Sequence, residues 1–451
     1  MKRILIKNLK AIVTVDDEDR VLENENIYIE DGVIKYIGKD VKEADEVIDG
    51  TNHYAYPGLV NTHHHFYQTF TRNLPKVQNM ELFNWLKTLY RIWENLDDEM
   101  IYYSTLTALG DLMKYGCTTS FDHHYVFPSN TTRTLIDTQF ASATEIGMRF
   151  HASRGSMSRS VKDGGLPPDT VVQTTDEILE DSLRLIDNYH DASRFSMRQV
   201  ALAPCSPFSV TEDLMKESAK LARSKGVRLH THLCETIDEE NYTLETVGLR
   251  PLAYMESLGW VGNDVWFAHG IHFNDDELKL LADTKTGIAH CPISNMKLSS
   301  GIARIPEMIK MNIPVGLAVD GSASNDGSNL LEEVRVAYLL HRLNSSFNAP
   351  SGYDILKLAT RGGAAVLGRD DIGSLEVGKG ADLFLVNTKH LSMVGVLEDP
   401  KSLFGTVGYH RPVDYTMING EVVVREGKLV KIDEDVVVDK AQGLVERLLN
   451  N

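Results

Sequence analysis

Eight short apolar runs, most of them separated by stretches with helical periodicity, constrain the fold of this chain more than any other feature. The clearest helical stretches are residues 98–116, 131–146, 174–190, 211–225, 274–284 and 328–343. The apolar runs are 57–62, 117–122, 148–152, 198–203, 227–232, 264–269, 286–290 and 314–319. This alternation predicts an α/β protein built on a (β/α)8 TIM barrel. A doubly wound sheet is the alternative, but it usually has fewer strands.

Both ends of the chain carry short β-rich segments. Near the start these are 12–15, 27–29 and 33–34, with an Asp31-Gly32 turn signal between the last two. Near the end they are 382–386, 415–418 and 422–424, with Asn419-Gly420 as a tight turn. Neither set can bury a core alone, so we expect them to pair in one small β-sandwich domain. The predicted organisation is a β domain from 1–56 plus 370–451 and a catalytic barrel over 57–369.

The charge balance excludes some partners. The chain has 451 residues, 46 Lys and Arg against 64 Asp and Glu, and a net charge of −18. Such an acidic surface repels nucleic acid and anionic membranes, whereas a small heterocyclic substrate in a closed pocket is compatible with it. A homo-oligomer is an open alternative, since the sequence does not determine the oligomeric state.

The cysteines and the first residues of the chain indicate in which cellular compartment we expect the protein. The four cysteines form no C-x-x-C pair, which is typical of reduced thiols in the cytoplasm. The first apolar run ends at Lys7 and Asn8, too early for a signal peptide. No run of 18 apolar residues could form a membrane-spanning helix.

Metal-ligand side chains follow several of the predicted strands. His63 and His65 follow the first, His232 ends the fifth and Asp320 follows the eighth. Strand ends converge on one face of a barrel, and residues two apart in extended chain point to the same side. Three imidazoles and a carboxylate form a ligand set for one divalent ion, Zn²⁺ with a position left for water. The same set also suits Fe²⁺ or Mn²⁺.

Each of these residues also has an ordinary structural interpretation. A lone His-x-His pair is usually a surface feature, His232 could be a core histidine, and Asp320 could form a turn. The ordered set at strand ends favours the metal site over these alternatives. Six further histidines are interpreted as structural, with a supporting role beside the ligands open for the first of them: His64, His123, His124, His151, His272 and His290.

Several motifs at these positions resemble the amidohydrolase superfamily, in its deaminase branch. The matching segments are 57–65, 232–236, 268–270 and 319–325, and 373–383 looks like the family's return into the β domain. The resemblance covers nearly the whole chain and implies metal-dependent hydrolysis on the barrel. Binuclear members bridge two metals with a lysine on the fourth strand. Residues 199–205 contain no lysine, which favours one metal and deamination.

Within that branch the chain resembles the 8-oxoguanine deaminases. The supporting segments are 66–69, 81–86, 122–128, 151–158, 165–169 and 203–208, although His124 stands where an apolar residue is expected. The implied reaction is the deamination of an amino-purine, foremost 8-oxoguanine to uric acid and ammonia. Triazine hydrolases share much of the pattern, so guanine, isocytosine-like and triazine rings remain alternatives. A metal-binding barrel without catalysis is a remote one.

The resemblance also implies roles for individual residues. The metal lowers the pKa of its bound water toward ~7, and Asp320 takes the proton of that water. Glu235 carries a proton to a ring nitrogen, and its alternative is a helix cap. His269 orients the water or polarises the reacting centre. The expected substrate contacts are Gln68, Trp85, Arg154 and Cys205, where Gln68 could instead tie down a loop and Trp85 could be plain core.

Overall fold

A parallel sheet of eight strands runs through the centre of the molecule. The computed structural model describes residues 2–131 and 133–450, so residue 132 of the predicted helix 131–146 and the terminal residues 1 and 451 lie outside it. The strands are, in sheet order, β16 (Val315–Leu317), β15 (Gly287–His290), β14 (Val265–His269), β13 (Arg228–Leu233), β12 (Arg198–Pro204), β11 (Arg149–Ser156), β10 (Cys117–Asp122) and β8 (Leu59–Asn61). They match the eight predicted runs and confirm the TIM-barrel prediction.

The barrel closes beside the predicted ligands. The Thr62 amide donates to the Leu317 carbonyl at 3.3 Å, which joins β8 to β16. Just beyond, β9 (His64–His65) pairs in parallel with β17 (Asp320–Gly321). The first and last strands of the barrel therefore bring two sequence-distant ligand segments side by side.

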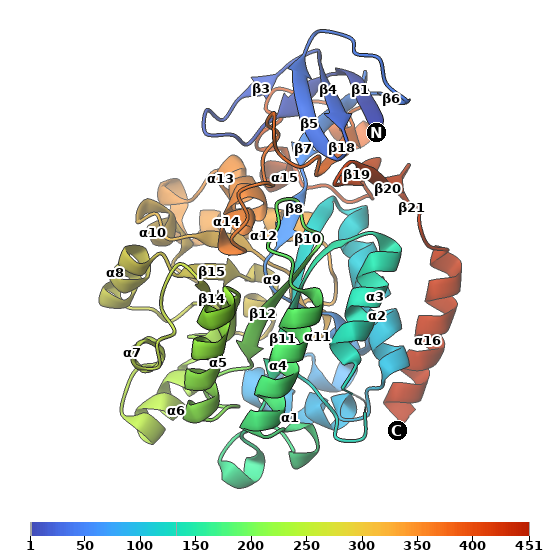
Figure 1. Cartoon of the computed structure of the whole chain (residues 1–451). Coiled ribbons are helices and arrows are strands. Elements are labelled where there is room, and N and C mark those ends of the chain that lie inside the picture. Colours follow the sequence, from blue (N-terminus) through green and yellow to red (C-terminus); the bar gives the residue numbers. More distant parts are fainter. Residues whose placement is uncertain (1, 132, 451) are drawn as a thin grey trace.

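Helices surround this barrel (Figure 1). The six predicted ones are α2 (Asp98–Lys114), α3 (Leu135–Ile146), α4 (Thr175–Tyr189), α5 (Glu212–Lys225), α8 (Asp275–Thr284) and α12 (Leu330–Ser345). Side-chain caps explain where α4 and α8 begin: Thr174 and Asn274 each form a capping box with the glutamate three residues on, which satisfies otherwise free backbone N–H groups. The others are α1 (Leu82–Trp93), α6 (Ile237–Val247), α7 (Pro251–Ser257), α9 (Pro292–Lys297), α10 (Ile305–Lys310), α11 (Ser322–Asn325), α13 (Gly352–Lys357), a π-helical turn (Leu358–Gly362) and α14 (Gly363–Val366).

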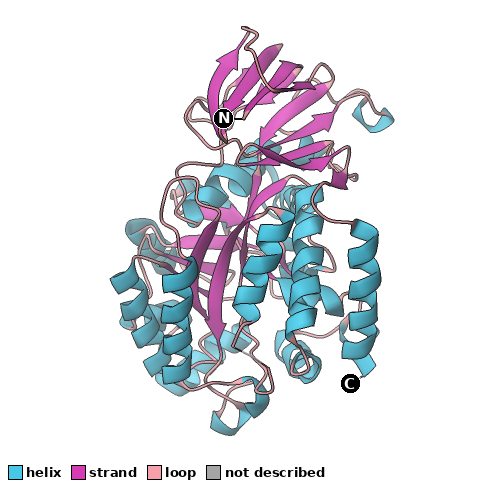
Figure 2. Cartoon of the chain, turned by 45° about the vertical axis from the view of Figure 1, so that its right-hand side comes forward, coloured by secondary structure: helices cyan, strands magenta, loops and turns pink. Residues whose placement is uncertain are grey.

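Two sheets from both chain ends form a separate β layer, and Figure 2 shows the barrel strands pointing away from it. One sheet has the order β5 (Val33–Gly38), β4 (Glu25–Glu30), β1 (Arg3–Leu9) and β6 (Glu46–Asp49). The other has the order β21 (Lys428–Leu429), β20 (Glu421–Arg425), β19 (Tyr415–Ile418), β18 (Leu383–Asn387), β7 (His53–Pro57), β2 (Ala11–Val13) and β3 (Val21–Leu22). A shared core that includes Ile6, Ile29, Leu383 and Met417 lies between them.

The predicted hairpin turns explain part of this pairing. Asp31 and Gly32 have φ of 47° and 79°, and Asn419 and Gly420 have 48° and 76°, the left-handed pair that a tight two-residue hairpin requires. The two turns touch, because a Cβ on Gly32 would lie 2.7 Å from the Asn419 carbonyl oxygen. The chain ends thus meet at their turns as well as in the sheet.

The last helix was not predicted. Residues 434–450, which the sequence interpretation placed in the β domain, form α16 (Glu434–Asn450), and this helix packs along α2 of the barrel. Its buried residues Ala441, Leu444 and Leu448 share one helical face. The short α15 (Leu403–Thr406) likewise packs against α12 and α13. The segment 370–451 is therefore divided between the sheets and the barrel surface.

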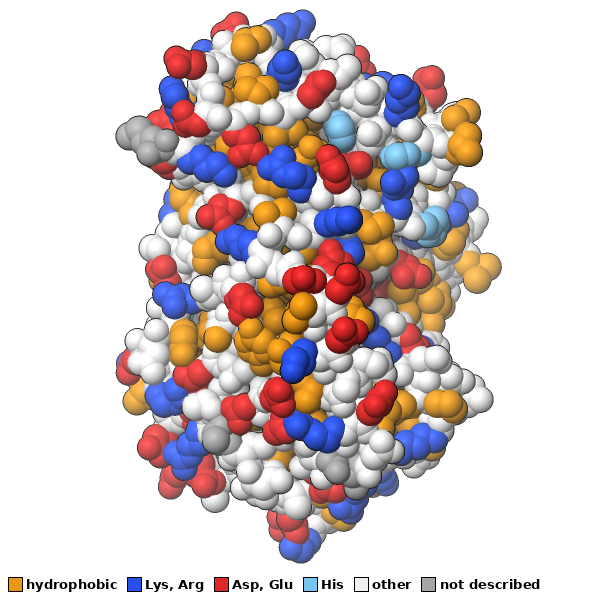
Figure 3. All heavy atoms as spheres, turned by 90° about the vertical axis from the view of Figure 1, so that its right-hand side faces the viewer, with side chains coloured by type: hydrophobic (Ala, Val, Ile, Leu, Met, Phe, Trp, Pro, Cys, Tyr) orange, Lys and Arg blue, Asp and Glu red, His pale blue; other side chains and the backbone are white. Residues whose placement is uncertain are grey.

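The surface that carries α16 mixes both charge signs. Figure 3 shows acidic and basic side chains interspersed on that face, with hydrophobic side chains between them. Within the described chain, none of the helices combines the length and the apolar character that a bilayer crossing requires.

Candidate active site

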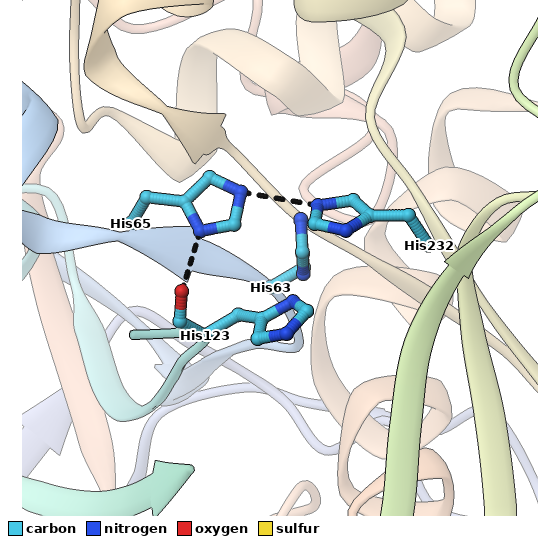
Figure 4. A group of neighbouring side chains, drawn as sticks. All are labelled: His63, His65, His123 and His232. Atoms are coloured by element: carbon cyan, nitrogen blue, oxygen red, sulfur yellow. Dashed lines mark hydrogen bonds between the residues drawn. The ribbon is translucent and has the colours of Figure 1, made fainter. Parts of the chain in front are cut away.

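Two buried histidines, His63 and His65, and the half-buried His232 converge where β8, β9 and β13 end, and their hydrogen bonds determine which ring nitrogen faces inward (Figure 4). His65 Nδ1 donates to the His123 carbonyl at 2.7 Å, and His232 Nδ1 donates to the Cys205 carbonyl at 2.6 Å. Carbonyl oxygens only accept, so both hydrogens sit on Nδ1 and both Nε2 atoms carry lone pairs. Those two Nε2 atoms face each other at 3.2 Å.

His63 is oriented in the same way through a second histidine. His230 Nδ1 contacts the Trp266 carbonyl at 3.0 Å, so its Nε2 accepts from His63 Nδ1 at 2.8 Å. The Nε2 atom of His63 is then a buried acceptor with no hydrogen-bond partner. Burial lowers the pKa of His63 to about 3, so the neutral ring is the stable form.

Asp320 completes this set of acceptors. Its Oδ1 lies 3.2 Å from His63 Nε2 and 3.3 Å from His65 Nε2. Three lone pairs and a carboxylate that converge this closely repel one another unless a cation lies between them. The donor set therefore fits a divalent metal, by its chemistry and by the orphaned His63 nitrogen.

The Asp320 backbone is held in a costly conformation. Its φ is 61°, and that of His269 is 73°, a region that residues other than glycine rarely adopt. Ser294 Oγ donates to Asp320 Oδ2 at 2.6 Å, and the Gly321 amide donates to Oδ1 at 2.7 Å. These bonds direct the carboxylate at the histidines although the local backbone is strained.

Glu235 and His269 form a second polar pair beside the metal ligands. Glu235 Oε2 lies 3.4 Å from His269 Nε2, and Ser300 Oγ donates to Oε1 at 3.2 Å. Burial raises the pKa of Glu235. Burial alone lowers the pKa of His269, but the carboxylates of Glu235 and Asp320 outweigh it and raise that pKa above its ordinary value. The pair can therefore share a proton and transfer it to a bound molecule.

These side chains border a pocket at this end of the barrel. Three of the four predicted substrate contacts, Gln68, Trp85 and Cys205, line it together with Glu235 and His269. Gln68 can lie beside Asp320 only because residue 321 is glycine: a Cβ there would be 1.9 Å from Gln68 Oε1.

Arg154 is the predicted contact that the structure places elsewhere. It is 1% exposed and is not among the residues that line the pocket. Its Nε donates to Asp181 at 2.6 Å, its Nη2 donates to Gln173 at 2.8 Å, and its guanidinium lies 3.8 Å from the centre of the Phe127 ring. A buried guanidinium needs such partners, so Arg154 joins β11 to α4 and the expectation of a substrate contact is corrected.

The other histidines near the site differ in their roles. His64 points away from the ligands and contacts Ser328 Oγ through Nε2 at 2.9 Å, so it holds the loop after β17. His124 contacts the Val126 carbonyl at 2.8 Å. His123 lies closer to the centre than expected: its ring stacks on that of His232 with centroids 4.7 Å apart, and its Nδ1 is buried without a partner.

Sequence reasoning missed several residues that orient the site. Both Glu239 oxygens accept backbone amides, from Cys234 and from Glu235, at 3.0 Å each. Asn295 Oδ1 lies 2.9 Å from His269 Nδ1. No local sequence pattern identifies Glu239 or Asn295. Leu82 and Leu86, which line the pocket beside the predicted Trp85, were also missed, although their helical spacing in α1 is a signal that could have identified them.

Comparisons with known proteins identify the family of this chain. The family model described as "Amidohydrolase family" matches residues 54–423. The 8-oxoguanine deaminase of Pseudomonas aeruginosa is 44% identical over 453 residues, with 100% of both chains covered. The hydroxydechloroatrazine ethylaminohydrolase of Pseudomonas sp. (strain ADP) is 39% identical, with 100% of this chain and 96% of the relative covered.

Solved structures show the same architecture. The atrazine chlorohydrolase of Arthrobacter aurescens TC1, solved in complex with zinc, superposes with a TM-score of 0.94 at 33% identity and covers 98% of this chain and 100% of that one. The match spans the barrel and the β domain alike. The chain belongs to the amidohydrolase family and is an aminohydrolase.

Proposed function

We propose that this chain deaminates 8-oxoguanine hydrolytically to uric acid and ammonia, with one zinc ion held by His63, His65, His232 and Asp320. The observation that carries the proposal is the convergence of three Nε2 lone pairs and the Asp320 carboxylate at the floor of a pocket that also contains Glu235. The 44% identity to an 8-oxoguanine deaminase over the full length supports the choice of substrate.

The metal ligands and the proton carriers have separate roles in the reaction. A bound divalent ion supplies the Lewis acidity that makes water nucleophilic at neutral pH. Asp320 accepts the proton that the attacking water loses, while Ser294 holds its other oxygen. The zinc-bound relative of known structure supports zinc over Fe²⁺.

Glu235 is placed to protonate the ring. Its burial keeps the acid form accessible, and Ser300 and His269 hold its two oxygens. As the water oxygen bonds to the amino-bearing carbon, Glu235 gives a proton to the adjacent ring nitrogen, which removes the developing negative charge. The proton held by Asp320 then passes to the amino group, which leaves as ammonia while the carbonyl forms and the remaining hydroxyl proton returns to Glu235. His269, whose pKa is raised, stabilises the carboxylate that Glu235 becomes.

Two unpaired polar atoms in the pocket lining match a purine edge. Gln68 Oε1, an acceptor, and Trp85 Nε1, a donor, are both buried without a hydrogen-bond partner among the residues that the structure describes. An unsatisfied buried group costs about 1–3 kcal/mol, which a ligand with the complementary donor and acceptor recovers. Such a pocket rejects analogues that lack those groups by up to ~10⁴-fold.

A substrate panel tests this proposal. We expect ammonia release and the appearance of uric acid with 8-oxoguanine, and a clearly higher kcat/KM than with guanine, isocytosine or an aminotriazine. Gln68→Ala should reduce that preference and leave the metal content unchanged, whereas Gln78→Ala, an exposed glutamine after the same segment, should change neither. Faster turnover of guanine or an aminotriazine would refute the substrate assignment.

A further inference from the structure

A second cavity lies at the end of the barrel opposite the active site. It has a volume of about 220 Å³ and is lined by residues at the N-terminal ends of β11 to β14, among them His151, Gln199, Arg228 and Trp266. His190 and Gly368 also line this cavity. None of its lining residues, all of which the structure describes, is an aspartate or a glutamate.

In both His151 and His190, one ring nitrogen accepts a hydrogen bond from the protein, so the other ring nitrogen carries the hydrogen. Arg369 Nη1 donates to His151 Nε2 at 3.3 Å, so the hydrogen of this neutral ring is on Nδ1. The Val200 amide donates to His190 Nδ1 at 3.2 Å, so the hydrogen of that ring is on Nε2. Neither N–H group has a hydrogen-bond partner within the described chain.

Arg228 adds a positive charge that forms no ion pair with a carboxylate of the described chain. Its Nη2 donates to the Asn263 carbonyl at 2.7 Å, but its Nε is buried without a hydrogen-bond partner among the described residues. Burial lowers the pKa of Arg228 to about 10, and the nearby Asp264 carboxylate, which opposes that shift, pairs with Arg223 at 2.8 Å. Among the described residues no carboxylate forms an ion pair with Arg228.

The backbone leaves room for this guanidinium. Gly368 has φ of 72°, and a Cβ at that position would lie 2.8 Å from Arg228 Nη1. The centre of the Trp266 ring lies 5.8 Å from the guanidinium carbon. The cationic group is thus packed near an indole ring and against a glycine that leaves room for it.

We propose that this cavity binds a small oxyanion, the phosphate or carboxylate group of a metabolite, through Arg228, His151, His190 and Gln199. An oxyanion accepts hydrogen bonds and carries the charge that an unpaired guanidinium requires. A cation or a neutral acceptor-poor molecule would leave these donors unsatisfied. This site is separate from the metal centre and does not depend on the proposed substrate.

Calorimetric titration of the holoenzyme with inorganic phosphate, and separately with malonate, tests the site, with chloride at matched ionic strength as the reference. We expect saturable binding of one oxyanion per chain, and the two titrations distinguish a preference for phosphate from one for carboxylate. Arg228→Gln should weaken binding at least about tenfold, because charge-assisted bonds are the strong ones. Arg342→Gln, which removes an exposed arginine on α12 that does not line the cavity, should bind as the unmodified protein does.

Two further variants keep the result interpretable. Asp320→Asn disrupts the metal centre, so binding that survives in this variant does not come from phosphate on the metal. His190→Ala removes a cavity donor from a half-buried position and should weaken binding even if Arg228→Gln fails to fold. Binding that is abolished by Asp320→Asn and unchanged by His190→Ala would overturn the proposal, and so would the absence of saturable binding in the unmodified protein.

Discussion

The two ends of the barrel use the same side chain, histidine, for opposite purposes. At the C-terminal end, His65 and His232 donate through Nδ1 to backbone carbonyls and present lone pairs. At the N-terminal end, His151 and His190 accept from an arginine and a backbone amide and so keep a free N–H. The hydrogen-bond partner of one ring nitrogen therefore determines whether the other nitrogen presents a lone pair to a cation or an N–H to an anion.

The carboxylates reinforce this difference. Asp320 and Glu235 are buried at the C-terminal end, and no acid lines the cavity at the N-terminal end. The protein thus concentrates acceptors and negative charge at one end of its strands and donors at the other, although its overall charge is −18. Net charge says little about which ion a particular cavity favours.

We expect the largest effect from a substitution at Asp320, the carboxylate that faces the histidine lone pairs at the C-terminal end of the barrel. Asp320→Asn replaces a charged acceptor by an amide, so we expect loss of the metal and a decrease of about 10⁴-fold in kcat/KM. Elemental analysis and ammonia assays measure both. Asp213→Asn, on the exposed start of α5, is the matched control and should be unaffected. Two ions per unmodified chain, or full activity without metal, would contradict the single-metal site.

Glu235→Gln separates proton transfer from metal binding. The amide keeps the shape of the side chain but cannot deliver a proton, so kcat should fall by at least ~10²-fold while the metal content persists. Glu256→Gln, an exposed glutamate on α7, serves as the control. If the metal is lost with Glu235→Gln, this residue is a ligand and the assignment of roles at this end is wrong.

Glu239→Gln should produce a smaller effect, since Glu239 acts only by positioning. Its two oxygens hold the Cys234 and Glu235 amides, and a glutamine can replace only one of them. We expect about 1–3 kcal/mol lower stability in chemical denaturation. A lower kcat with unchanged metal content and KM should accompany it. Glu245→Gln, exposed on the same helix, should match the unmodified protein, and equal kcat values for both variants would remove Glu239 from the site.

The smallest effect concerns the N-terminal cavity. Gln199→Ala removes a neutral donor, which contributes about 0.5–1.5 kcal/mol, so phosphate affinity should fall several-fold, less than with Arg228→Gln. The kcat for deamination should not change, because the cavity lies at the other end of the strands. If Gln199→Ala lowered the phosphate affinity as much as Arg228→Gln does, charge would not be the dominant contribution to binding in this cavity.

The sequence alone determined the barrel, the β domain and the identity of the metal-ligand candidates. Each of these features depends on local patterns: apolar runs between amphipathic helices, Asp-Gly and Asn-Gly turns, and ligand residues directly after strands. Such patterns act over a few residues, so they can be recognised without knowing what the segment will contact. The predictions for Gln68, Trp85 and Cys205 as pocket residues also agree with the structure.

Only the tertiary structure decided which atoms these residues present and which of them are free. Arg154 follows a barrel strand as predicted, yet Asp181 on α4 holds its guanidinium away from the pocket. The lone pair on His232 depends on the Cys205 carbonyl, and the cavity donors depend on Arg369 and Val200. A hydrogen bond between distant segments leaves no periodic trace in either of them, so the direction of each histidine proton becomes known only when the strands are assembled.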